Sequence, residues 1–294
     1  MTQLLTILIK FLCYLFASLP RRVHLLMGDT LGLIWFYIVP IRRRVALENI
    51  ERAFPDWPKE KCFSMARRNF QHYATGFIEV LLLPYFDKKL FDKLVVVENR
   101  EIYTNAMNKG KGLFFVSLHI GSWELMSACN AHMNIPLSVI SKKFKARGLN
   151  QIWVDLRLAR GIKIISAEKS TFDILRAIRK KEAIGFILDQ FMGPPVGVKT
   201  TFFGHETGTQ AGLALFADRT RAPVIPVYNV RLPDGRLKII FEEEVSFMEQ
   251  GSTDRNISFM TQQYTSKIEE IIKKYPEQWL WIHRRWKPFR GGAR

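Results

Sequence analysis

Short apolar runs and longer amphipathic segments alternate along most of this chain. Apolar runs of roughly four to eight residues indicate buried strands, and apolar positions recurring every three or four residues indicate helices. The predicted strands are 95–97, 113–118, 137–141, 162–166, 183–189, 223–230 and 236–242. The predicted helices are 45–54, 59–83, 102–108, 123–133, 149–159, 171–180, 209–219 and 257–274, and a long loop is expected over 190–208. This order predicts an α/β fold: a central, mostly parallel or mixed sheet flanked by helices, with an antiparallel hairpin through Pro233, Asp234 and Gly235.

The first 41 residues differ because they contain two apolar stretches without this alternation. Leu4–Leu19 is almost entirely apolar, and Leu31–Ile41 contains three aromatic residues and is followed by Arg42–Arg44. Aromatics and arginines at the end of an apolar segment are typical of a membrane interface, and the arginines favour a cytoplasmic location for the rest of the chain. We therefore predict a hydrophobic helical membrane anchor over 1–41 and a second domain over 42–294. A spanning helix needs about 20 residues, so the pattern leaves open a span, an interfacial position or two core helices.

The charge of the chain points to anionic partners. Lys and Arg total 44 against 27 acidic residues, a net charge of +17, and many of the cations occur in clusters. Such a surface suits nucleic acid or an anionic lipid surface. The apolar N-terminus and the lack of a recognised nucleic-acid-binding module favour the lipid surface. The three cysteines are odd in number and lack metal-type spacing, which argues against a disulfide framework or a zinc site.

The most informative segment is residues 112–124, which read GLFFVSLHIGSWE. An apolar strand leads to His119, a glycine turn comes next, and Ser122 is placed to begin a helix with Glu124 in its first turn. His119 is thus expected at the carboxyl end of a strand, where open α/β sheets hold their sites. We expect Glu124 to reach back to the imidazole, because a carboxylate on one ring nitrogen fixes the tautomer of a general base.

This His-x4-Glu arrangement resembles the motif of the lipid A biosynthesis lauroyl/myristoyl acyltransferases, a branch of the glycerolipid acyltransferase-like proteins. Further segments are similar to that family over roughly residues 20–290. They are 151–161 (QIWVDLRLARG), 185–190 (GFILDQ) with the Gly-Pro after it, 202–204 (FFG) and 283–286 (HRRW).

The resemblance implies an O-acyltransferase without a metal or other cofactor. It makes His119 and Glu124 the catalytic pair, and it implies an essential arginine, for which Arg157 aligns best and Arg160 is the alternative. Asp189, which ends a strand, is expected to contact Arg157 or the substrate.

The partners that the resemblance implies are an acyl carrier protein or acyl-CoA donor and a lipid A precursor in the bacterial inner membrane, reached from the cytoplasmic side. The basic run Lys142–Lys145 would suit an acidic carrier protein. Two alternatives remain open at this point. One is an acyltransferase acting on another glycolipid, phospholipid or aminolipid, and the other is a non-catalytic membrane-binding protein.

Overall fold

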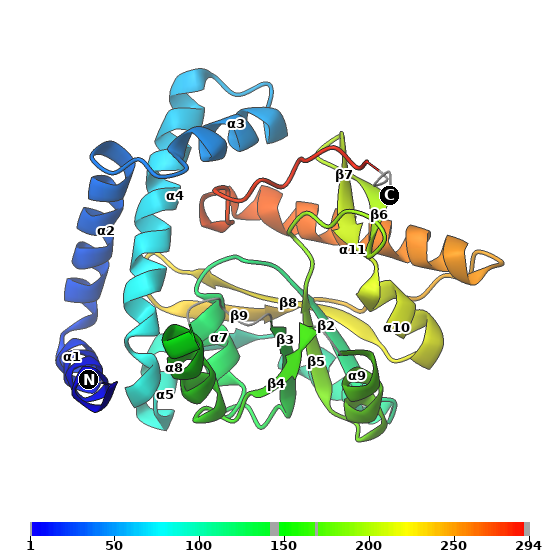
Figure 1. Cartoon of the computed structure of the whole chain (residues 1–294), viewed down its shortest axis with the longest axis horizontal. Coiled ribbons are helices and arrows are strands. Elements are labelled where there is room, and N and C mark those ends of the chain that lie inside the picture. Colours follow the sequence, from blue (N-terminus) through cyan, green and yellow to red (C-terminus); the bar gives the residue numbers. More distant parts are fainter. Residues whose placement is uncertain (1, 142–146, 168–169, 291–294) are drawn as a thin grey trace.

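A seven-stranded sheet forms the centre of the protein in the computed structural model, which describes residues 2–141, 147–167 and 170–290 (Figure 1). Its strand order is β1-β9-β8-β2-β5-β3-β4. The strands are β1 Val95–Glu98, β2 Leu113–Ser117, β3 Leu137–Ser141, β4 Lys163–Ser166, β5 Ala183–Ile187, β8 Val224–Arg231 and β9 Leu237–Phe241. All neighbouring strands run parallel except β8 and β9, which form the antiparallel hairpin that the turn at Pro233–Gly235 predicted. The predicted α/β class with a mostly parallel mixed sheet is confirmed.

The two faces of the sheet pack against different sets of helices, because side chains alternate along a strand. Phe114 and Val116 of β2 belong to the core that includes α9 Ser170–Arg179, α10 Gly212–Thr220 and α11 Thr253–Lys274. Leu113 and Phe115 belong to the other core. That core includes residues of α5 Lys88–Leu94, α6 Arg100–Asn108 and α7 Trp123–Cys129. The strand β2 is buried along its whole length, which explains why four of its five residues are apolar.

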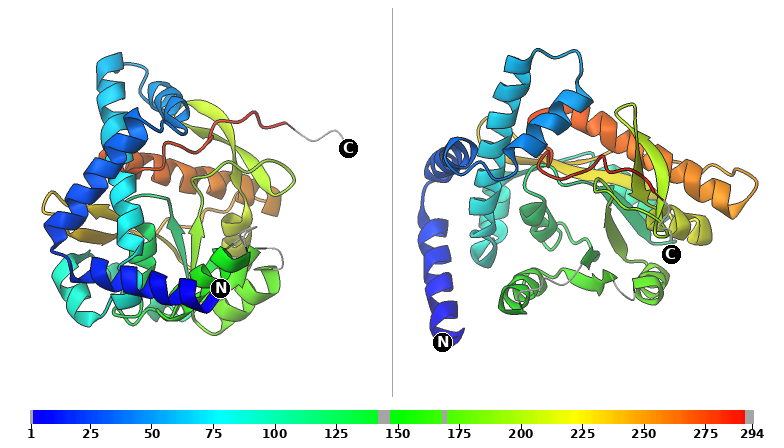
Figure 2. Two further views of the ribbon diagram at one scale, coloured as in Figure 1. Left: turned by 60° about the vertical axis from the view of Figure 1, so that its left-hand side comes forward. Right: turned by 45° about the horizontal axis from the view of Figure 1, so that its top comes forward.

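Four helices precede the sheet: α1 Thr2–Ser18, α2 Arg21–Tyr37, α3 Arg43–Ala53 and α4 Lys59–Val80. Helix α2 runs along α4 on the side away from the sheet (Figures 1 and 2). The two backbones approach closely at Gly28 and Gly32. A Cβ at Gly32 would lie 2.2 Å from the Cα of Gln71, so glycine is required there. Helix α2 is therefore packed as part of the fold.

The expected membrane anchor over 1–41 is the part of the fold prediction that the structure does not support. Within the described residues, no helix combines the length and apolarity needed to cross a bilayer. Many apolar side chains of α1, α2 and the segment after them are nevertheless exposed, among them Leu8, Phe11, Leu12, Tyr14, Leu15, Leu26, Ile34, Tyr37, Ile38 and Ile41. The division of the chain at residue 41 stays a prediction.

The expected loop 190–208 is wrong, because it contains most of a second, two-stranded antiparallel sheet. Strand β6 is Gly197–Phe202 and β7 is His205–Gln210, joined by a tight turn at Phe203 and Gly204, which both have positive φ. The glycines and prolines before residue 197 suggested a loop, and the buried positions of the two strands include threonines in place of larger apolar residues. These threonines are Thr200, Thr207 and Thr209. Two smaller corrections concern helices: α5 was missed, and the helix expected over 123–133 ends at Cys129.

Candidate active site

His119 and Asp189 are brought together by the register of two neighbouring parallel strands. In that register Ser117 of β2 lies beside Ile187 of β5. His119 follows Ser117 by two residues, and Asp189 follows Ile187 by two residues. The amide of Leu188 donates to the carbonyl of Ser117 at 3.1 Å, which continues the alignment beyond the strands. Both side chains therefore lie at the carboxyl edge of the sheet, as predicted for His119.

The carboxylate of Asp189 has three donors. The His119 ring donates from Nδ1 to Oδ1 at 2.8 Å, and the His119 backbone amide donates to Oδ2 at 3.0 Å. The indole of Trp279 donates to Oδ2 at 2.8 Å. Burial alone would raise the pKa of Asp189, but the neighbouring His119 and these hydrogen bonds hold it below its usual value. Asp189 is therefore ionised although it is buried.

The imidazole of His119 has a raised pKa and a defined tautomer. Burial would lower its pKa, but the charge and hydrogen bond of Asp189, together with the charge of Glu124, raise it above the ordinary value. Because Nδ1 holds its proton against Asp189, the lone pair lies on Nε2. The side chain keeps 18% of its surface exposed, so the imidazole can be reached by a substrate. The Trp123 ring packs edge-on against the imidazole at a centroid distance of 5.2 Å.

Glu124 does not make the contact to the imidazole ring that the sequence predicted; Asp189 makes it. The Glu124 carboxylate is instead held by Arg157, through Nη2–Oε1 at 2.7 Å and Nε–Oε2 at 3.1 Å. The indole of Trp123 adds a hydrogen bond to Oε1 at 3.1 Å. The reason is the turn between His119 and Glu124. Gly121 there has a φ of 63° and packs against Asn229 too closely for a Cβ.

The structure separates the two candidate arginines. Arg157, on α8 Arg147–Leu158, forms the ion pair with Glu124 and also donates to Ser141 at 3.2 Å. Arg160 points elsewhere and donates to the backbone carbonyls of Pro84 and Phe86. Arg157 is thus beside the site, whereas Arg160 ties the end of α8 to the turn after α4. Asp189 and Arg157 do not form the contact that was one of the two expectations for Asp189. Asp189 pairs with His119, and Arg157 pairs with Glu124.

Two cavities meet at Trp123. The first has a volume of about 180 Å³ and is lined by Tyr73, Gly76, Phe77, Val80, Gly121, Ser122, Trp123, Glu124 and Trp153. The second, of about 70 Å³, lies on the sheet face that α7 covers. Its lining is mainly apolar, with Ser117, Ser127 and Asn130 as polar members; the apolar residues include Phe115, Met126, Met133, Leu137, Val139, Ile187, Val227 and Ile239. Trp123 lines both cavities and packs against the His119 ring, so two mainly apolar spaces lie beside the imidazole.

The C-terminal segment contributes to the site, and sequence reasoning missed this. Trp279 forms an antiparallel bridge with Ile120, and the Leu280 amide donates to the His119 carbonyl at 3.1 Å. The Tyr73 hydroxyl donates to the same carbonyl at 3.1 Å. The clustering of tryptophans near the C-terminus and the family-like segment 283–286 were signals in the sequence, but neither says what these side chains contact.

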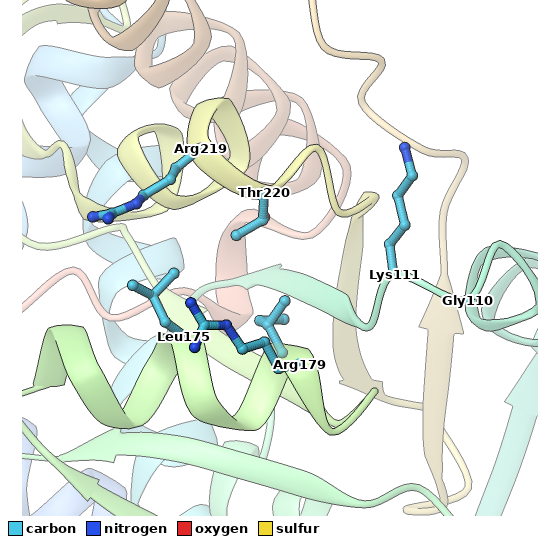
Figure 3. Close-up of a pocket in the computed structure, with 7 residues that line it drawn as sticks. Gly110, Lys111, Leu175, Arg179, Arg219 and Thr220 are labelled. Carbon is cyan, nitrogen blue, oxygen red and sulfur yellow. The ribbon is translucent and has the colours of Figure 1, made fainter.

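A further pocket with three cationic side chains is shown in Figure 3. Its volume is about 300 Å³, and its cationic side chains are Lys111, Arg179 and Arg219. These residues precede β2 or end α9 and α10, so they lie at the amino edge, away from His119. Part of the positive charge is therefore remote from the reaction site. The basic run Lys142–Lys145 lies outside the described residues.

Comparison with known proteins agrees with the geometry. The sequence model for bacterial lipid A biosynthesis acyltransferases matches residues 1–288. The lipid A biosynthesis palmitoleoyltransferase of Escherichia coli (strain K12) is 27% identical over 284 residues, 93% of this chain and 88% of that protein. The lipid A biosynthesis lauroyltransferase of the same strain is 23% identical over 278 residues, covering 93% and 88%. This chain accordingly belongs to the bacterial lipid A biosynthesis acyltransferase family, and it is an O-acyltransferase.

Proposed function

We propose that this enzyme transfers a fatty acyl chain from a thioester donor to a hydroxyl of a lipid A precursor, with His119 as general base. The observation that supports the proposal is a partly exposed imidazole whose Nδ1 is fixed by a buried carboxylate, which leaves the lone pair on Nε2. Nε2 removes the hydroxyl proton, and the oxygen attacks the thioester carbonyl carbon. The carbon–sulfur bond then breaks, and the imidazolium returns the proton to the leaving thiolate. No covalent enzyme intermediate is needed because the thioester is already activated.

The Glu124–Arg157 pair is proposed to line the acceptor side of the site. Glu124 borders the cavity of about 180 Å³, and Arg157 is 2.7 Å from its carboxylate. The guanidinium charge is suited to a substrate phosphate or to the oxyanion that develops on the thioester carbonyl. Asp189 takes the positioning role first expected of Glu124.

The apolar cavity beside Trp123 is proposed to receive the acyl chain. Its lining offers aliphatic, aromatic and methionine side chains, and burial of each CH₂ group contributes about 0.8 kcal/mol. A series of donors with increasing chain length tests this. We expect the rate to pass through a maximum and to fall once the chain outgrows the cavity, whereas equal rates for all lengths would contradict the assignment.

The exposed apolar side chains of α1 and α2 are proposed to lie in the interface of the inner membrane, on the cytoplasmic side. Exposed Arg22, Arg42 and Arg44 adjoin this apolar surface and can bind anionic head groups. We expect the protein to float with vesicles that contain an anionic lipid, and a salt concentration of about 0.5 M to weaken the binding by screening its electrostatic part. A protein that remains unbound to such vesicles at low salt would contradict this placement.

The main test compares wild type with His119→Ala in detergent, using labelled acyl carrier protein thioester, labelled acyl-CoA and a panel of acceptor lipids. We expect transfer to the lipid A precursor by wild type and a loss of at least about 10³-fold in the variant. A thermal melt checks that the variant is folded. Undiminished activity in folded His119→Ala would refute the mechanism, and transfer only to other lipids would change the acceptor but keep the chemistry.

A further inference from the structure

Trp279 forms a hydrogen bond to the charged pair from a distant part of the chain. Its side chain is fully buried, and its indole N–H donates to Asp189 Oδ2 at 2.8 Å. The other carboxylate oxygen faces the imidazole at 2.8 Å. The indole and the imidazole thus share a single carboxylate, and any change at one oxygen acts on the other.

The backbone around Trp279 is held on both sides. On one side, the Gly121 amide donates to the Gln278 carbonyl at 3.2 Å, and Leu280 donates to His119. On the other side, the buried amide of Asn69 on α4 donates to the carbonyls of Glu277 and Trp279, at 2.7 and 2.8 Å. The backbone that carries the indole is therefore held both by α4 and by the turn that contains His119 and Gly121.

A second amide on the N-terminal helices repeats this arrangement. Asn49 of α3 donates to the carbonyls of Trp281 and His283, at 2.6 and 2.7 Å. These four bonds join helices before residue 81 to the last part of the chain. The Trp279 and Trp281 rings are also fully buried, so this segment is held by packing as well as by hydrogen bonds.

We propose that Trp279 is a positioning residue of the acyl-transfer reaction, which holds the Asp189 carboxylate in the orientation that fixes the tautomer and basicity of His119. The inference rests on the proposed role of His119 as base. The indole N–H stabilises negative charge on Asp189 when His119 is neutral, and it matters less when the imidazolium neutralises that charge. Loss of the N–H therefore favours the protonated imidazole.

Three other titratable groups that face the pair, His283, Arg285 and Tyr73, keep one charge state over most of the working range. Burial lowers the pKa of His283 to about 4, and burial lowers that of Arg285 to about 10. Burial and the charge of Asp189 raise the pKa of Tyr73 well above its usual value. Glu124 is paired with Arg157. The ascending limb of the rate profile between about pH 5 and 9 therefore reports His119.

The test is the pH dependence of kcat for Trp279→Phe, with Trp281→Phe as the matched control. Trp281 is equally buried, but its indole donates at 2.6 Å to the backbone carbonyl of Pro276. We expect Trp279→Phe to lower kcat about tenfold, because hydrogen bonds to charged groups are among the stronger ones. We also expect the midpoint of the ascending limb to move to higher pH. The control should keep the wild-type midpoint.

If Trp279→Phe does not fold, 3-benzothienylalanine at position 279 replaces the N–H by sulfur with the ring shape kept. An unmoved midpoint in the folded variant, or equal shifts in both tryptophan variants, would overturn the proposal. This result is distinguishable from failure of the proposed function, which would appear as full activity of His119→Ala. Loss of activity in His119→Ala together with an unmoved midpoint would refute the Trp279 inference alone.

Discussion

Two buried carboxylates, Asp189 and Glu79, show how similar local environments serve different purposes. Glu79 on α4 is completely buried and is held by Arg21 of α2 and Arg231 of β8, the latter through Nε at 3.1 Å and through Nη2. Asp189 is almost as deeply buried but is held by a histidine and an indole. Both carboxyl groups have a lowered pKa, which for Glu79 is about 2.

The difference lies in the partners. Burial would raise the pKa of Glu79, but two arginines outweigh it, and arginine does not lose its proton in proteins. That cluster keeps one charge state and joins α2, α4 and the hairpin after β8. The partner of Asp189 is a histidine, a side chain that can gain and lose a proton in the physiological range, and this side chain is partly exposed. A buried carboxylate thus supports chemistry when its partner titrates, and supports structure when its partner does not.

Asp189→Asn should show the largest effect on activity. The asparagine amide would donate where a carboxylate accepts, which favours a proton on Nε2 and removes the lone pair from the substrate side. We expect kcat to fall by about 10³- to 10⁴-fold, measured as initial rates of acyl transfer with excess donor. Denaturation curves should show a folded protein, and kcat within tenfold of wild type would mean that Asp189 does not orient the base.

Glu79→Gln should mainly reduce stability. Removal of the carboxylate leaves Arg21 and Arg231 without their shared counter-charge, and a broken buried ion pair costs about 3–5 kcal/mol. The free energy of unfolding, measured by urea titration in detergent, should fall by that amount, while kcat of the folded fraction stays within a few-fold of wild type. A kcat loss as large as that of Asp189→Asn would remove the distinction between the two clusters.

The same variant sharpens the comparison at low pH. Because folding depresses the pKa of Glu79, its contribution to stability is complete above the ordinary value of 4.5 and is lost as pH falls towards about 2. Wild type should therefore lose part of its stability over this interval, and Glu79→Gln should lose less. Parallel curves for the two proteins would show that Glu79 is not the group responsible.

Glu124→Gln should have the smallest effect of the three substitutions when each effect is expressed as a free energy. The glutamine keeps the shape and can still accept from Arg157, but it removes one charge that raises the pKa of His119. We expect kcat/KM to fall about 10- to 100-fold, the equivalent of one charge-assisted contact, and the ascending limb to move to lower pH. If Asp189→Asn and Glu124→Gln lowered the rate equally, the result would favour a shared role for the two carboxylates.

Sequence reasoning found the components of the site but not all of their contacts. His119 and Asp189 were both placed at strand ends, yet β3, β4 and three helices separate β2 from β5 along the chain. Strand order is a long-range property, so proximity in sequence favoured Glu124 as the partner. Trp279 was hidden for the same reason, since its contact with Asp189 joins residues 90 positions apart.

The sequence by itself determined the α/β class, the positions of most strands and helices, and the family. These depend on local periodicity and on motifs with short spacing, which survive without knowledge of the fold. Only the tertiary structure decided which carboxylate holds His119, which arginine reaches the site, and that the C-terminal tryptophan belongs to it. Those choices depend on strand order, on the turn at Gly121 and on which side chains share a buried space, and such relations arise only when distant segments pack together.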